Sequence, residues 1–130
     1  MAGNKYSTIF IKFGDADRDI LMTQAMMMKD RFKSFVVLVV ENDEDKKTLK
    51  DNSDLFEDSI NVGEHDISEV VLRYCDEMKR SKEDATFVGV LEDNGAELKS
   101  NGFSVKNPGE MAESYKKAME MLEKMVINPK

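Results

Sequence analysis

The chain has 130 residues, which suits one domain with its own hydrophobic core, so we expect a single α/β domain over residues 1–130. A net charge of −7 disfavours general binding to nucleic-acid backbones or anionic membranes. No apolar run approaches the roughly 20 residues that cross a bilayer, and the first residues lack the apolar core of a secretion signal. The single cysteine excludes an internal disulfide and fits a cytoplasmic protein.

The first forty residues predict a strand, a helix and a second strand. Residues 7–13 are almost continuously apolar, as in a central buried strand, and Gly14 ends this run. Residues 17–33 carry apolar side chains at helical spacing. The six apolar residues 35–40 predict a second strand that is buried on both faces. A strand, a helix and a strand in sequence favour a parallel pair.

The middle of the chain predicts peripheral and then buried elements. The acidic segment 41–58 has only a thin apolar stripe, which indicates a peripheral helix, and Ile60 and Val62 suggest a very short strand. Asp66 and Glu69 have the spacing of a capping box at the start of the next helix. The apolar face of that helix includes Cys75, so we expect a buried structural thiol rather than a nucleophile.

The C-terminal third predicts a strand, a hairpin and a helix. Residues 86–91 read as a strand, and Asn94-Gly95 is typical of a type I′ turn. Residues 96–99 are therefore expected to form an antiparallel partner strand. The last helix should begin at Asn107, with Glu110 at its third position.

These elements run in the order β-α-β-(α)-α-β-β-α, which indicates a three-layer α/β sandwich around a central mixed sheet. The run 85–88, the Asn94-Gly95 turn, Gly102 and the final helix follow one another as in the thioredoxin fold, and the chain resembles that family. The resemblance implies a redox-inactive member, because there is no Cys-x-x-Cys and Ala85 stands where the family has its cis-proline. A flavodoxin-like or other doubly wound sheet is the alternative, especially if the strand around Ile60 exists.

Asp15, Asp17 and Asp19 crowd the turn that follows the first strand. Turns at this end of a strand commonly hold ligands in open α/β sheets, and clustered carboxylates suit Mg²⁺ or Ca²⁺. An EF-hand is excluded, because Ile20 replaces its glycine. Asp-x-Asp after a strand is also typical of Mg²⁺-dependent phosphoryl-transfer enzymes, and Glu41, Asp43, Glu92 and Asp93 follow later strands. The simpler interpretation is a helix cap with solvated charges and no cofactor.

Ten methionines are many for this length, and four of them lie in the run 22–28. Flexible thioethers fill cores and also form adaptable binding surfaces, so Met22, Met26 and Met27 are candidates for a protein interface. His65 is the only histidine and precedes a helix cap, where a solvated loop residue is expected.

The main hypothesis from the sequence is a non-catalytic protein-binding or adaptor domain of thioredoxin-like topology, with a protein partner or a second copy as its ligand. The alternative is a divalent-metal-dependent ligand binder or phosphoryl-transfer enzyme that uses Asp15, Asp17 and Asp19.

Overall fold

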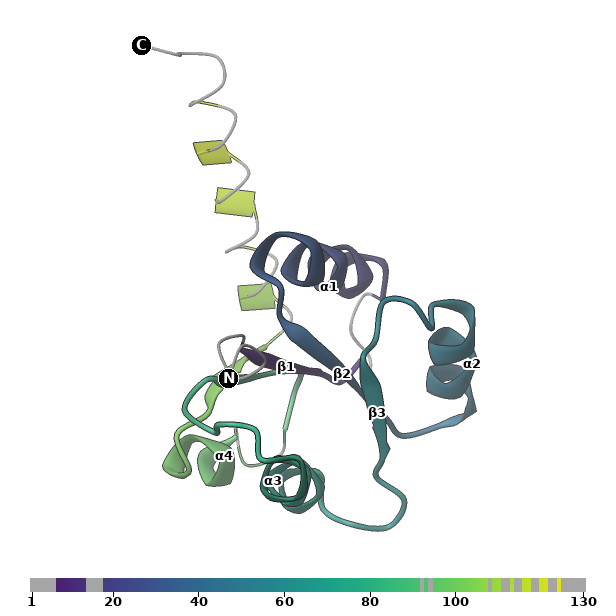
Figure 1. Cartoon of the computed structure of the whole chain (residues 1–130), viewed down its shortest axis with the longest axis vertical. Coiled ribbons are helices and arrows are strands. Elements are labelled where there is room, and N and C mark those ends of the chain that lie inside the picture. Colours follow the sequence, from purple (N-terminus) through teal and green to yellow (C-terminus); the bar gives the residue numbers. More distant parts are fainter. Residues whose placement is uncertain are drawn as a thin grey trace.

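A computed structural model describes residues 7–13, 18–91, 93, 95–107, 109–110, 113, 116–117, 120–121 and 124. Its centre is a five-stranded, entirely parallel sheet in the order β3-β2-β1-β4-β5 (Figure 1). The strands are β1 Thr8–Ile11, β2 Phe35–Val40, β3 Asp58–Asn61, β4 Ala85–Val88 and β5 Ser104–Lys106. The helices are α1 Arg18–Phe32, α2 Asp43–Asp51, α3 Ile67–Met78 and α4 Ala96–Ser100. The described residues from 109 to 124 are also helical and project away from the sheet (Figure 1).

The sheet is buried on both faces. Along β1, Phe10 joins one apolar cluster, whereas Ile9 and Ile11 join another, because successive strand residues point to opposite faces. The first cluster is completed by residues of α3 and α4, and the second by residues of α1. Helices therefore cover both faces of the sheet, which confirms the three-layer α/β sandwich (Figure 1).

The predicted antiparallel strand at residues 96–99 is wrong. These residues form helix α4, and the chain then returns as β5, which pairs in parallel with β4. The carboxylate of Asp93 explains the difference, because it accepts hydrogen bonds from the backbone amides of Gly95 (2.9 Å) and Glu97 (3.4 Å). Those bonds satisfy donors at the start of a helix, and buried Leu98 then anchors the helix to the core.

The mixed sheet and the thioredoxin-like order are wrong for the same reason, since every strand pair among the described residues is parallel. The alternative of a doubly wound sheet is confirmed, and the predicted short strand around Ile60 exists as β3. β3 adds to the edge of the sheet beside β2.

The two predicted capping boxes have different outcomes. At the last helix the box is complete, because Glu110 accepts from the Asn107 amide (3.0 Å) while Asn107 accepts from the Glu110 amide (2.8 Å). At α3, Asp66 occupies the N-cap position, but its side chain makes no capping hydrogen bond. The amides at the start of α3 therefore lack this partner.

None of the helices in the described part of the chain is both long enough and apolar enough to cross a membrane.

Two glycines with positive φ give a matched test of packing between α4 and β5. Gly95 has φ of +73°, and an added Cβ would lie 2.7 Å from Val105 Cγ1, whereas Gly63 has φ of +61° and open space around it. Gly63→Ala should cost about 1–2 kcal/mol from backbone strain alone. Gly95→Ala should cost about 1–3 kcal/mol more, because Val105 must move. Urea unfolding measures both, and equal losses would contradict this packing.

Candidate functional site

A crevice of about 530 Å³ lies at the edge of the sheet where the strands end. Its lining comes from the segments that follow four strands and from the start of α3, namely Lys12, Glu41, Val62, Gly63, His65, Asp66, Ile67, Ser68, Val90, Leu91 and Asp93. From β1 the chain runs into α1 on one face of the sheet, whereas α3 leads into β4 from the other face. Ligands of open α/β sheets bind at such a reversal of direction.

Gly89 fixes the closest approach of two strand ends at this crevice. A Cβ at Gly89 would lie 2.8 Å from Lys12 Cβ and 3.1 Å from the Lys12 carbonyl oxygen. The Lys12 amide donates to the Val88 carbonyl (2.9 Å), and the Gly89 amide donates to the Lys106 carbonyl (3.0 Å). The backbone thus holds the ends of β1, β4 and β5 together beneath the crevice.

Most charges around the crevice already have partners. Lys12 Nζ lies 3.5 Å from Glu41 Oε1, and the Lys12 side chain is largely buried whereas that of Glu41 is partly exposed. Asp93 caps α4 through both oxygens. Glu69, one residue beyond the lining, lies 3.5 Å from Arg73 and 3.9 Å from His65. The polar groups that stay available for a ligand are therefore concentrated at the start of α3.

Arg18 anchors the start of α1 next to the acidic turn. Its guanidinium donates to the carboxylate of Asp45 (2.7 Å), which is wholly buried, and it lies 4.6 Å from the centre of the Phe13 ring. Asp45 also accepts from the Glu41 amide (2.9 Å), so the same carboxylate ties the end of β2 to α1. Because Phe13 and Arg18 lie in contact, the residues that flank the segment 14–17 are held together.

Sequence reasoning missed both Asp45 and Arg18. The available signal was Asn42, which caps α2 by accepting from the Asp45 amide (2.9 Å), as Asn commonly does at a helix start. That pattern places Asp45 in the first turn of α2. It does not reveal that the carboxylate is buried against a distant arginine.

The structure brings only part of the predicted acidic cluster together. Glu41 lines the crevice, and Asp19 lies exposed in the first turn of α1 and is engaged in an interaction there. Asp15, Asp17 and Glu92 lie outside the described residues. Within the described part of the chain, no group of three His, Cys, Asp or Glu side chains is placed to hold a metal ion. Any metal site at this edge would need the carboxylates of the turn.

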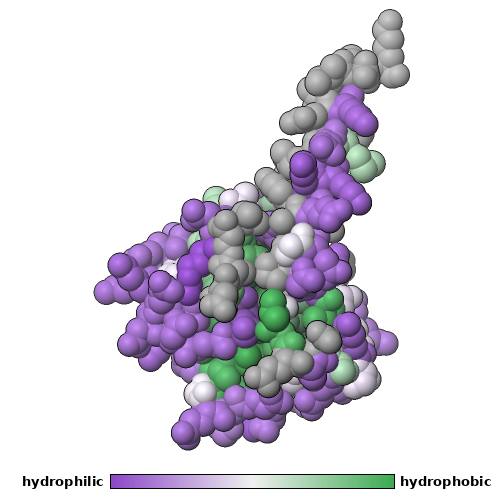
Figure 2. Space-filling view, turned by 180° about the vertical axis from the view of Figure 1, so that it is seen from behind, coloured by the Kyte–Doolittle hydropathy of each residue, from purple (hydrophilic) through white to green (hydrophobic). Residues whose placement is uncertain are grey.

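The methionines of α1 divide between the core and the surface. Met22 is half-buried and packs on the apolar cluster beneath α1, Met27 is half-buried, and Met26 is 53% exposed. Seen from behind, the molecule is mostly hydrophilic, with its apolar side chains gathered in one region of the body (Figure 2). An interface through Met22, Met26 and Met27 stays a prediction.

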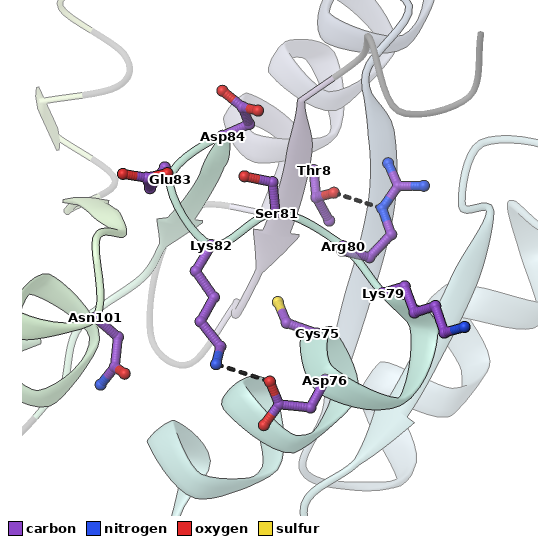
Figure 3. A pocket seen from close by; sticks show the side chains of 10 residues that line it. All are labelled: Thr8, Cys75, Asp76, Lys79, Arg80, Ser81, Lys82, Glu83, Asp84 and Asn101. Carbon is purple, nitrogen blue, oxygen red and sulfur yellow. Dashed lines mark hydrogen bonds and ion pairs between the residues drawn. The ribbon is translucent and has the colours of Figure 1, made fainter. Parts of the chain in front are cut away.

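A larger cavity, of about 740 Å³, lies at the opposite edge of the sheet, where β1 and β4 begin (Figure 3). Two of its three cations, Lys82 and Arg80, are already engaged by neighbours, whereas Lys79 has no ion pair among the described residues. Lys82 Nζ lies 2.7 Å from Asp76 Oδ1, and Arg80 Nε donates to Thr8 Oγ1 (2.8 Å) while its guanidinium stacks 4.1 Å from the centre of the Phe35 ring. Figure 3 shows these paired side chains around the opening. We therefore place the candidate site at the carboxyl edge.

Cys75 also lines that cavity and is 1% exposed, in agreement with the expected structural thiol. Burial raises the pKa of its thiol to about 11, since the thiolate loses solvation there. Burial, together with the hydrogen bond that Tyr74 donates to Asp58, likewise raises the pKa of Tyr74. Neither group is activated as a nucleophile.

Comparison with known proteins gives a likeness in structure without one in sequence. No model of a known protein family matches the chain, and no curated protein sequence matches it. A protein from Streptomyces avermitilis assigned as a HAD family hydrolase is similar over 82% of this chain and 68% of its own, with 10% identity and a TM-score of 0.55. The core domain of a protein from Streptococcus pneumoniae assigned as a phosphoglycolate phosphatase is similar over 78% and 79%, with 12% identity and a TM-score of 0.51.

At this level of identity the likeness shows the fold. It overturns the thioredoxin-like interpretation, and with it the hypothesis of a non-catalytic protein-binding or adaptor domain, because the similar folds are those of hydrolases. The physical reason is the pairing of the last strand, since β5 lies parallel to β4 where the thioredoxin-like order requires an antiparallel strand.

The Arg18–Asp45 pair gives a prediction for stability. Asp45→Asn keeps the shape of the side chain but leaves Arg18 without its buried counter-charge, and should lower the free energy of unfolding by about 3 kcal/mol. Asp43→Asn is the matched control on an exposed position of the same helix turn, and should change it by less than about 0.5 kcal/mol. Denaturant unfolding measures the free energy of unfolding of both variants, and similarly small losses in the two would contradict the role given to Asp45.

The raised pKa of Cys75 gives a pH dependence. In the unfolded chain the thiol ionises near pH 9, whereas in the folded chain it holds its proton up to about pH 11. Its contribution to stability is therefore complete below pH 9 and is lost as the pH rises from 9 to 11, by at most about 3 kcal/mol. Cys75→Ala should flatten the fall of unfolding free energy over this range, and an unchanged slope would contradict it.

Proposed function

We propose that this chain is a phosphoryl-transfer enzyme that hydrolyses a small phosphate ester with the help of a divalent cation at the carboxyl-edge crevice. The observation that carries the proposal is that Lys12 at the end of β1 lines a crevice built from four strand ends, and Asp15 and Asp17 follow Lys12 closely in the sequence. The fold supports it, because one similar protein is assigned as a HAD family hydrolase and another as a phosphoglycolate phosphatase.

Asp15 and Asp17 are the residues we assign to the chemistry. A carboxylate serves phosphoryl transfer either as a nucleophile or as a ligand of the metal. Asp19 is the third member of the sequence cluster, and its position in the first turn of α1 keeps a negative charge at the positive end of that helix.

Mg²⁺ fits this donor set better than Ca²⁺. Ca²⁺ takes six to eight oxygen ligands, whereas Mg²⁺ is commonly held by one or two carboxylates together with substrate phosphate and water. Two carboxylates from one short turn match the second pattern. When bound, the ion would polarise a phosphoryl oxygen.

Lys12 is the protein cation closest to the end of β1, and we assign it to the charge of the phosphoryl group. It is paired with Glu41 at 3.5 Å. The pair keeps the Lys12 ammonium group at the crevice and compensates its charge. A phosphoryl group in the crevice would replace Glu41 as the partner of Lys12. A positive charge that is held in place in this way can stabilise the negative charge that develops in a transition state.

Hydrolysis of p-nitrophenyl phosphate by the full chain tests the proposal. Activity should require Mg²⁺ and disappear with a chelator. Asp15→Asn and Asp17→Asn should each lower kcat/KM by about a hundredfold or more, since each removes a charge from the reacting centre. Asp51→Asn, an exposed carboxylate at the end of α2, is the matched control and should leave the activity unchanged.

Thermal unfolding with Mg²⁺ gives an independent readout. At a hundredfold its dissociation constant the ion should stabilise the protein by about 2.7 kcal/mol, and the shift should vanish in Asp17→Asn. A shift without turnover of any phosphate ester would establish a metal-dependent ligand binder instead of an enzyme. The absence of both would refute the proposal.

A further inference from the structure

The start of α3 presents free backbone donors to the crevice. The first amide of this segment that bonds to a preceding carbonyl is that of Val70, which donates to Asp66 (3.1 Å). The amides of residues 67–69 precede Val70 in the chain, so they have no helical acceptor, and the Asp66 side chain does not cap them. Such amides, together with the positive end of the helix dipole, attract anions.

Ser68 adds a second and independent observation. Its side chain lines the crevice, and the residue is only 3% exposed. None of the hydrogen bonds found among the described residues involves its hydroxyl, although Thr23 and Thr48, which also lie in helices, both donate to a carbonyl one turn earlier. Among the described residues, only the Gln24 amide has side-chain polar atoms that are both fully buried and unbonded, so the Ser68 oxygen reaches the open crevice and its hydroxyl can donate to an acceptor there.

The charges nearby fit an anion more closely than the overall charge of −7 suggests. Glu41 is paired with Lys12, and Asp93 is occupied as the cap of α4. His65 also lines the crevice. Asp66 is the remaining carboxylate of the lining, and it opposes an anion.

We infer that the N-terminus of α3 and the Ser68 hydroxyl form the subsite for the phosphate group of the ligand. The phosphate oxygens would accept from the free amides of residues 67–69 and from Ser68 Oγ. This inference deepens the proposed function, on which it rests for the choice of phosphate as the anion. It assigns phosphate recognition to residues that the acidic turn does not contain.

Titration of the full chain with inorganic phosphate, followed through backbone amide signals by NMR, tests the subsite. Phosphate should shift the amide signals of residues 67–69. Ser68→Ala should weaken binding by about tenfold, because it removes one hydrogen bond to a charged group. Asp66→Asn should strengthen binding several-fold, since it removes the opposing charge without removing a capping bond.

Ser81→Ala is the control, an exposed serine in the cavity at the opposite edge of the sheet, and should bind like the unmodified chain. Circular dichroism shows whether each variant is folded, and the exposed Asp66 position keeps the test valid should Ser68→Ala unfold. Equal affinities in the unmodified chain and both α3 variants, or shifts confined to the opposite edge, would overturn the inference. Phosphate binding at α3 without hydrolysis would refute the proposed enzyme and leave the subsite standing.

Discussion

The fold depends on the burial of β1 and β2 between two apolar layers. Every residue of β1 and all but the first of β2 are buried, so their peptide groups can bond only to neighbouring strands. Side chains point alternately into the two clusters, which leaves no position along these strands for a polar group facing water. Polar residues are therefore displaced to the strand ends, and the parallel arrangement collects those ends at one edge.

That edge is shaped by two constraints that act on the backbone. At Gly89 the chain leaves β4 so close to Lys12 that no side chain fits between them. At the other side of the crevice, the buried carboxylate of Asp45 binds both Arg18 and the amide of Glu41. The first constraint joins the ends of β1 and β4, and the second joins the end of β2 to the start of α1. The crevice is thus held by the same contacts that hold the sheet.

The sequence predicted what depends on long apolar runs and on local capping. Residues 35–40 could only be a buried strand, and Asn107 with Glu110 formed the expected reciprocal cap. Residues 96–99 were mistaken for a strand because Asn94-Gly95 is typical of a hairpin, whereas Asp93 caps a helix there through two backbone amides. The acidic segment was recognised from the sequence, but Ser68 was not. The role of Ser68 depends on the packing of the start of α3 against the strand ends, and no local sequence pattern predicts that packing.

The overall charge of this chain is a poor guide to its crevice. A net charge of −7 would repel phosphate if the charges were spread evenly over the surface. At the crevice, however, Glu41 is offset by Lys12 at 3.5 Å, and the Asp93 carboxylate accepts from backbone amides at the start of α4. The unbonded donors at the start of α3 are not offset in this way. An acidic protein can therefore present a local site for an anion, provided that its carboxylates are used to hold the fold.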